Sequence, residues 1–531
     1  MAKKQKTTDT LNLESILFNC REYLRSNASL MDKRDLLLTL IFLRFIGEKF
    51  DITQNELKQK CLNNGIVDEN VINQFINNPK NYGGIAFVPE KARWSMIIDQ
   101  PSSKLNATLD DAIQELENSG DALKGCIRIG LFTQINLEAN VIKKVVDEVN
   151  KISHKTFGEE KDLIGRVYEY FLKSFAVNAT KEEGEFYTPH DIVELIAAFI
   201  EPYDGTLYDP CCGSGGMFIQ CAKYVEAKQG DIKMVNVYGQ ERDPATYRLA
   251  KMNLAMRGIS HHLGEQNADT FSNDLHKGLT FDFIMANPPF NLKKWYDISM
   301  SKDSRWADYS VPPEGNANYA WILHMLSKLK AGKGVAGFLL ANGALGDGDA
   351  VAIAIRKKLI ENDKIEAIIV VPRELFYTTD ISVTLWILNE NKKGGMWHGR
   401  KLRNRQKEIL FMDLRQWSEN PVKNEQKKKV ELKVDQIKKA AEIYFKWQGE
   451  GTDGTNYAEP ETFRSVGFEE LDKNGYSLVP SRYIEFVDRD STIDYPQVLT
   501  ETATTVADLL KRQQKNDETL RKALKHLGYD C

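Results

Sequence analysis

The spacing of apolar residues divides the chain into three parts. Up to about residue 155, apolar residues recur at helical spacing, as they do between positions 13 and 24. From about 156 to 395, short apolar runs typical of buried strands alternate with helical patterns. From about 396 to 531 the chain is more polar, and it ends in an incomplete apolar stripe between Val506 and Leu527. The pattern predicts a helical domain, an α/β domain and a C-terminal region whose helix must pack on this chain or on a partner.

The middle part contains the strands and helices of one sheet. Strands are expected at 206–209, 235–239, 281–286, 335–340, 365–371 and 383–388, and helices at 217–227, 319–329 and 350–360. Another strand-like stretch ends at 267–269. The last two strands are joined without a helix, which indicates a hairpin at the edge of the sheet.

The tetrapeptide Asn287-Pro288-Pro289-Phe290 follows one of these buried strands. Two consecutive prolines stop a strand and fix its backbone, so Asn287 is held at the carboxyl end of the strand, where open α/β sheets bind ligands. The side-chain oxygen of Asn287 and the carbonyl of Pro288 can both accept hydrogen bonds from one planar NH₂ group, and Phe290 can stack on its ring. A simple strand-ending turn is the alternative interpretation.

A glycine-rich turn precedes this motif. Asp209-Pro210-Cys211-Cys212-Gly213-Ser214-Gly215-Gly216 runs from a strand into a helix, which is typical of a nucleotide-type cofactor site. Glu241 follows the next strand, in the position that usually holds a ribose diol, and Asp269 follows the stretch after that.

These motifs resemble those of one family. Residues 184–190 read Gly-Glu-Phe-Tyr-Thr-Pro-His, and this block, the glycine-rich turn and Asn-Pro-Pro-Phe follow in that order. The motif pair is similar to that of the S-adenosylmethionine-dependent adenine-N6 DNA methyltransferases. Block order and the helical N-terminal region resemble the modification (M) subunit of type I restriction-modification systems. The resemblance covers most of the chain and matches the last hundred residues only loosely.

The resemblance implies a fold and a set of site residues. The fold would be a methyltransferase (Rossmann-like) α/β sheet with a hairpin edge at 156–395, an all-α domain at 1–155 that contacts DNA or partners, and a helical C-terminal region at 396–531. The catalytic residues would be Asn287, Pro288, Pro289 and Phe290. The residues that bind S-adenosylmethionine would be Glu185, Phe186, Tyr187, Thr188, Pro189, His190, Asp209, Gly213, Ser214, Gly215, Gly216, Glu241 and Asp269. No metal is expected, because the histidines have no acid or cysteine at ligand spacing.

The implied reaction is methyl transfer to the N6 amine of an adenine that is flipped out of the duplex. Another planar amine, in a protein glutamine or an RNA base, stays open as the substrate, as does a non-catalytic cofactor-binding scaffold. A nuclease or translocase is not expected in this chain, since it has no phosphate-binding Gly-x-x-x-x-Gly-Lys-Ser/Thr loop.

Charge and composition indicate that the chain works with partners. The formal net charge is −4 over 531 residues, whereas a free-standing DNA-binding protein usually has a basic excess. Basic runs at 400–407 and 427–429 are interpreted as solvated surface, with phosphate contact as the alternative. The resemblance implies double-stranded DNA, a specificity subunit that reads the target, a second copy of this chain and a restriction subunit as partners. No membrane span or secretory signal is expected, and the scattered cysteines are typical of a reduced cytoplasm.

Overall fold

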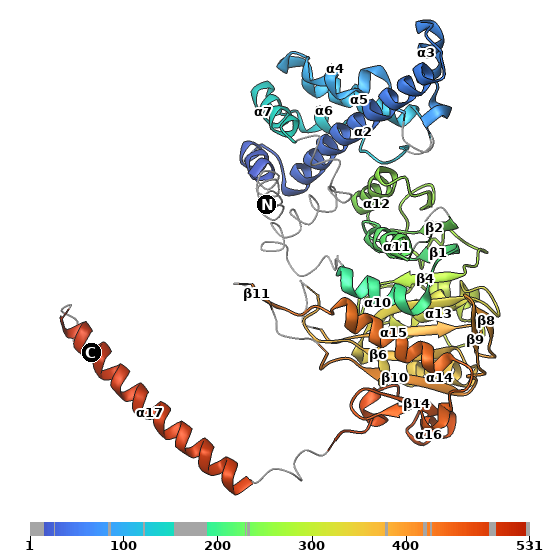
Figure 1. Cartoon of the computed structure of the whole chain (residues 1–531), viewed down its shortest axis with the longest axis vertical. Coiled ribbons are helices and arrows are strands. Elements are labelled where there is room, and N and C mark those ends of the chain that lie inside the picture. The colour runs from blue at the N-terminus through green and yellow to red at the C-terminus, as the bar shows by residue number, and fades with distance from the viewer. Residues whose placement is uncertain are drawn as a thin grey trace.

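The chain folds into a helical N-terminal part, a large α/β part and a separate C-terminal helix (Figure 1). The computed structural model describes residues 15–25, 27–82, 87–120, 123–152, 188–228, 230, 234–376, 381–417, 422–424, 427–487 and 495–526. The predicted fold class is confirmed, because a mixed central sheet with helices on it follows a helical N-terminal region.

The first five strands of the sheet are parallel. Their order across the sheet is β3, β2, β1, β4 and β5. Their bounds are β1 (Gly205–Asp209), β2 (Val235–Gly239), β3 (His261–His262), β4 (Phe283–Ala286) and β5 (Val335–Ala341). The order reverses at β1, which pairs with β2 on one side and β4 on the other, and such switch points are where open sheets bind ligands. β3 ends several residues earlier than the sequence predicts, so Asp269 lies in a loop after it.

The sheet continues beyond β5 in a way that the sequence did not predict. β7 (Val383–Asn389) lies antiparallel between β5 and β6 (Ile365–Val370), and the order then runs through β10 (Glu408–Asp413) and β14 (Phe463–Gly467) to β13 (Ala458–Glu459). The expected hairpin exists, but it lies inside the sheet and not at its edge. The C-terminal region is therefore not purely helical, since it adds three strands to the sheet.

Helices cover both faces of the sheet. The core on one face includes residues of α10 (His190–Ile200), α11 (Gly216–Ala227) and α15 (Val434–Gln448). The core on the other face includes residues of α13 (Asn318–Ser327) and α14 (Ala350–Glu361). Strands β4, β5, β6 and β7 are buried along their whole length because they are covered on both sides, which explains their continuous apolar sequences. Smaller elements are β8 (Gly395–Trp397), β9 (Arg400–Leu402), β11 (Val422–Asn424), β12 (Lys427–Lys429) and α16 (Phe468–Lys473).

Three arginines of the basic run at 400–407 form ion pairs within the α/β part. Arg405 is fully buried and its Nε donates to Glu366 Oε1 at 2.8 Å. Arg403 bonds both oxygens of Glu408, at 3.0 and 2.8 Å, and Arg400 pairs with Glu201. The interpretation of these three arginines as solvated surface is wrong, because each one neutralises an acid within the α/β part.

The N-terminal part is helical, as predicted. Its long helix α2 (Leu30–Asn63) begins at Ser29, whose side chain accepts a hydrogen bond from the Asp32 N–H, as an N-cap should. The first half of α2 packs in one core with α5 (Leu105–Asn118) and α7 (Ala139–Asn150). The shorter helices are α3 (Glu69–Ile76), α4 (Trp94–Ile98) and α6 (Leu131–Ile135).

Helix α12 (Pro244–Met256) belongs to both parts of the molecule. Its Leu249 and Met252 lie in the core of the N-terminal helices. Its Tyr247, Ala250 and Leu254 lie in the core of the sheet. The N-terminal helices are thus packed directly on a helix of the α/β part.

Helix α17 (Tyr495–His526) stands apart from the rest of the chain (Figure 1). Its apolar side chains are exposed, with Leu499 at 67% and Leu520 at 58% exposure. Within the described ranges, no helix combines the length and the apolar character needed to cross a bilayer.

Candidate active site

The Asn-Pro-Pro-Phe motif lies at the carboxyl end of β4, beside the switch point of the sheet. Asn287 Nδ2 donates to Thr188 Oγ1 at 2.9 Å, which fixes the orientation of the amide. Asn287 Oδ1 is buried and has no hydrogen-bond partner among the described residues. A buried acceptor without a donor costs on the order of 1–3 kcal/mol, and a ligand that brought a donor to this atom would remove that cost.

Three asparagines hold the chain immediately after the motif. Asn291, at φ +53°, accepts hydrogen bonds through Oδ1 from Asn318 Nδ2 at 2.9 Å and Asn316 Nδ2 at 3.2 Å. The Asn291 N–H donates to Asn318 Oδ1 at 3.1 Å. Asn318 is only 2% exposed and begins α13. This network was not predicted from the sequence, although the Asn-x-Asn spacing at the start of a helical pattern was an available signal.

Phe290 is half-buried and held by a second ring. Its ring centroid lies 6.1 Å from that of Phe376, with the planes at 89°. This edge-to-face contact is a favourable aromatic geometry and orients Phe290. Phe376 was not among the predicted site residues, and nothing in its local sequence indicates the contact.

The glycine-rich turn joins β1 to α11 with the backbone that a close ligand requires. Gly213 and Gly215 have φ of +54° and +76°, which other residues rarely adopt. The Gly213 N–H donates to Glu241 Oε2 at 3.0 Å, and Asn253 Nδ2 of α12 donates to the Ser214 carbonyl at 2.8 Å. The turn is therefore fixed from two sides, by the acid after β2 and by α12.

Glu241 and Asp269 lie on neighbouring loops that are tied together. Glu241 Oε1 accepts from the Asp243 N–H at 2.8 Å, and Asp269 Oδ1 accepts from the Phe271 and Ser272 N–H groups, both at 3.0 Å. The Ala268 N–H donates to the Glu241 carbonyl at 2.8 Å. Each carboxylate oxygen has more than one lone pair, so both acids keep capacity for a ligand hydroxyl or amine.

Gln240 holds the second of these loops in place, which the sequence did not predict. It is fully buried, and its Nε2 donates to the carbonyls of Ala268 at 3.2 Å and Asn273 at 2.8 Å. Its Oε1 accepts from the Leu275 N–H at 3.1 Å. Because these partners follow it by some thirty positions, its own neighbourhood in the sequence gave no signal.

Asp209 ends β1 beneath the turn. Its side chain is 2% exposed, and Oδ1 accepts from the Cys211 N–H at 2.9 Å. Burial, with a smaller contribution from the charge of Glu241, raises the pKa of Asp209 to about 7. A cationic ligand beside this carboxyl would stabilise its charged form.

Cys211 and Cys212 fill space beside the turn. Burial raises the pKa of both thiols well above the usual value, so neither is a reactive thiolate. A Cβ added at Gly239 would lie 3.2 Å from Cys212 Sγ and 2.7 Å from Leu263. The packing at this position leaves no room for a larger residue.

The upstream block is described only in part. Glu185, Phe186 and Tyr187 lie outside the described residues. Thr188 contacts Asn287, a pairing that the sequence did not reveal, and Pro189 is the buried residue that precedes α10. His190 is exposed, and its Nδ1 lies 3.6 Å from Glu194 on the same helix.

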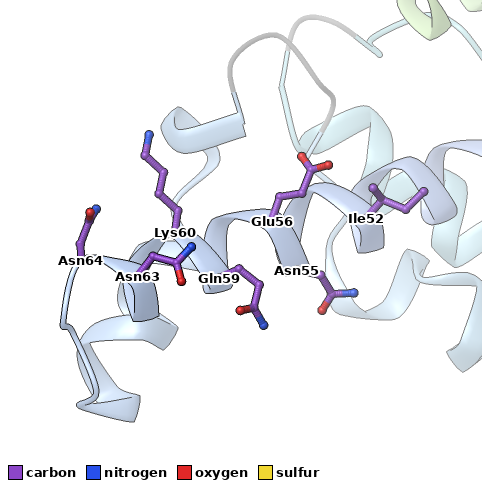
Figure 2. A pocket seen from close by; sticks show the side chains of 7 residues that line it. All are labelled: Ile52, Asn55, Glu56, Gln59, Lys60, Asn63 and Asn64. Carbon is purple, nitrogen blue, oxygen red and sulfur yellow. The ribbon is translucent and has the colours of Figure 1, made fainter.

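An open hollow of about 550 Å³ lies elsewhere, on the second half of α2. Figure 2 shows its lining, which is formed by Ile52, Asn55, Glu56, Gln59, Lys60, Asn63 and Asn64. These residues are exposed, and none of them comes from the motifs described above. The hollow is therefore separate from the motifs, which lie at the carboxyl edge of the sheet.

Two family models match successive parts of the chain. The family N-6 DNA Methylase matches residues 159–491, and the HsdM N-terminal domain matches residues 13–149. The HindI methylase subunit of the type I restriction enzyme of Haemophilus influenzae is 34% identical over 83% of this chain and 100% of its own length. The MjaIX methylase subunit of Methanocaldococcus jannaschii is 31% identical over 98% of this chain and 92% of its own length.

A solved structure supports the fold. The type I restriction-modification methyltransferase subunit from Streptococcus thermophilus superposes with a TM-score of 0.68 at 22% identity, over 90% of this chain and 99% of that one. At this identity the similarity shows the fold alone.

Proposed function

The chain belongs to the N-6 DNA methylase family, among the methylase subunits of type I restriction enzymes. From this premise we propose a role for each of its site residues in adenine methylation. Asn287 activates the N6 amine and Phe290 stacks on the flipped base. The loops after β1, β2 and β3 hold S-adenosylmethionine. The observation that carries the proposal is the buried Asn287 Oδ1, which has no partner among the described residues and is kept in place by Thr188.

The geometry of the motif suits an exocyclic amine. Adenine N6 is a weak nucleophile because its lone pair is delocalised into the ring. When Asn287 Oδ1 and the Pro288 carbonyl accept its two N–H groups, the nitrogen moves towards tetrahedral geometry and its electron density rises. The residues around the motif thus act mainly by positioning and by electrostatic stabilisation. Phe290, oriented by Phe376, offers one face to the flipped ring.

The backbone and the charged residues after β1, β2 and β3 support S-adenosylmethionine as the ligand. Gly213 and Gly215 let a ligand approach the backbone, and α11 begins at Gly216 with free N–H groups. Glu241 would accept the ribose hydroxyls, Asp269 the adenine amine, and Asp209 would face the cationic methionine part. When bound, the sulfonium supplies the methyl group for in-line displacement by the activated amine.

The partners are proposed on chemical grounds. A net charge of −4 gives the chain little general attraction for DNA, and the apolar residues of α17 need a covering surface. We assign that surface to a specificity subunit that reads the DNA target. A second copy of this chain and a restriction subunit complete the proposed assembly.

Substitution of Asn287 tests the catalytic assignment. Asn287→Ala should reduce transfer of labelled methyl groups to duplex DNA by orders of magnitude, while calorimetry shows nearly unchanged cofactor affinity. The assay uses the full chain co-purified with its specificity subunit, and hydrolysed DNA is examined for N6-methyladenine. Asn362→Ala, at the exposed C-cap of α14, serves as the control. Near-normal turnover in Asn287→Ala would show that the amine is activated in another way.

A further inference from the structure

We infer that the loop between the catalytic motif and α13 enters the DNA, and that Ile298 at its tip occupies the space which the flipped adenine leaves in the duplex. The inference rests on the proposed function and adds the element that keeps the duplex open. It is carried by three observations: the loop is anchored in both halves of the site, its tip carries an exposed apolar side chain, and exposed lysines stand on the same loop.

The loop is anchored at the catalytic motif by the asparagine network. Asn291 follows Phe290 directly and is bonded to Asn316 and Asn318. The Ala317 N–H donates to the Leu292 carbonyl at 3.0 Å, so the two ends of the loop are joined. Asn291 and Lys294 have φ of +53° and +55°, which cost energy for residues with a Cβ. The surrounding contacts therefore hold the loop in a defined shape.

The second anchor is Arg305, which attaches the loop to the cofactor side. Its guanidinium donates to the carbonyls of Thr270 at 2.9 Å and Phe271 at 2.5 Å, directly after Asp269. Asp303 balances the charge, with Arg305 Nη2 2.7 Å from Asp303 Oδ2. Arg305 is thus a positioning residue. It joins the loop that follows Asn-Pro-Pro-Phe to the loop that contains Asp269, which is expected to contact the cofactor adenine.

Two tryptophans of the loop are buried and fix it by packing and by hydrogen bonds. Trp295 is buried, its ring centroid lies 5.0 Å from that of Phe271, and its Nε1 donates to the Pro313 carbonyl at 3.0 Å. Trp306 is also buried, and its Nε1 donates to the Met300 carbonyl at 2.9 Å. Between these two tryptophans, Asp297, Ile298 and Ser299 are exposed, whereas Met300 is buried.

The tip carries an apolar side chain in the open. Ile298 is 75% exposed, although Met300 two residues later is buried. Asp297 Oδ1 accepts from the Ser299 N–H at 2.9 Å and fixes the turn that presents Ile298. A single exposed isoleucine is tolerated on a protein surface, but a ligand that covered Ile298 would gain the free energy of burying its apolar side chain.

The neighbours of Ile298 fit nucleic acid. Lys293, Lys294 and Lys302 are exposed on the same loop. Lysines neutralise phosphates, and apolar wedges between base steps stabilise an opened duplex. Exposed acids also stand on the loop, at Asp297, Asp308 and Glu314, so the lysines are separate points of positive charge and the loop as a whole is neutral. We expect DNA that presents an adenine to Asn287 to approach this loop, because the loop begins directly after Phe290 and Arg305 bonds it to the loop after Asp269.

The test uses Ile298→Ala in the full chain bound to its specificity subunit, on a duplex whose target site has been mapped by sequencing methylated DNA. With 2-aminopurine at the target position, the fluorescence rise on binding should be several times smaller than for the unsubstituted protein. Single-turnover methylation of the normal duplex should slow about tenfold, since unstacking is no longer compensated. Cofactor affinity and the melting temperature should stay unchanged.

Rescue distinguishes a duplex-opening role from a structural one. Opposite an abasic position the target adenine is already unpaired, so Ile298→Ala should methylate it within about twofold of the unsubstituted rate. Met396→Ala is the matched control, since Met396 is 68% exposed on β8 and should change neither rate. An equal loss on both duplexes, no loss on either, or loss of the specificity subunit from the complex would overturn the inference. If Asn287→Ala is inactive while Ile298→Ala behaves normally, only the role of the loop is wrong; an active Asn287→Ala removes the proposed function itself.

Discussion

Glu241 shows how one side chain serves both the protein and the ligand. Its carboxylate receives the N–H groups of Gly213 and Asp243, at 3.0 and 2.8 Å, and so holds the turn that it would share with the cofactor ribose. An acid in this position preorganises the site before a ligand arrives.

Replacement of Glu241 should therefore weaken cofactor binding strongly. We expect Glu241→Ala to lose roughly 1.5–3 kcal/mol of S-adenosylmethionine binding, because charge-assisted hydrogen bonds and the support of Gly213 disappear together. Isothermal titration calorimetry measures the loss, with the exposed Glu265→Ala as the control. Unchanged affinity in Glu241→Ala would remove this residue from the cofactor site.

Asp209 predicts a pH dependence of cofactor binding. Its pKa of about 7 in the free protein means that its carboxyl is largely protonated in acid. A cationic ligand favours the carboxylate and lowers the pKa, so binding releases a proton. Affinity should rise with pH up to that pKa, by at most about tenfold per pH unit, and level off above it. Calorimetry on both sides of the pKa, in buffers of different ionisation enthalpy, measures this release. In Asp209→Asn the affinity should no longer change with pH; an unaltered pH profile would contradict the assignment.

Individual site residues could be predicted only where the signal is local. Asn287, Glu241 and the glycines stand in short motifs with a direct chemical meaning. Gln240, Asn253 and Asn318 position those motifs through partners far along the chain, and a single sequence does not show such pairings. Their roles follow from the folded structure alone.

At the scale of elements, the order of strands was harder to predict than their existence. β6 and β7 were expected as an edge hairpin because no helix joins them, yet both are buried along their whole length. Continuous apolar runs are typical of strands covered on both faces, which favours an interior position. The strands that complete the sheet, β10, β13 and β14, are short and separated by α15, so nothing local assigns them to it.

Helix α12 allows a prediction about how the N-terminal helices affect the cofactor site. Met252→Ala should destabilise the protein by about 2–5 kcal/mol, as expected for a buried methionine. It should also weaken cofactor binding, because the same helix carries Asn253, which holds the Ser214 carbonyl at 2.8 Å. Hydrogen exchange should show faster opening of α2, α7 and the glycine-rich turn. Met325→Ala, in the core around α13, is the matched control and should destabilise without loosening the N-terminal helices. Equal exchange behaviour of the two variants would disprove the connection.

On the scale of the whole molecule, α17 is the clearest sign of a partner. Its sequence predicted a stripe that needed covering, and in the structure its apolar residues are exposed, with Leu509 at 57% and Leu510 at 56%. The net charge of −4 agrees with the proposed assembly, because it gives the chain little general attraction for DNA phosphates.

Removal of α17 should separate assembly from cofactor binding. A chain that ends at residue 487 should bind S-adenosylmethionine with normal affinity but fail to co-purify with the specificity subunit, and DNA methylation should then be lost. Leu510→Asp in the full chain should have the same effect, which excludes a general consequence of truncation. Efficient, sequence-specific methylation by the truncated chain alone would show that it is self-contained.

Because the single helix α12 is packed into two cores, a structural change in one core also affects the other. If DNA or a partner subunit displaces the N-terminal helices, α12 must repack or move, and the carbonyl of Ser214 moves with it. The free energy by which such a displacement alters cofactor affinity must equal the free energy by which the cofactor alters the displacement. Binding of DNA or a partner at the N-terminal helices and binding of the cofactor at the glycine-rich turn therefore change each other's affinity by the same factor.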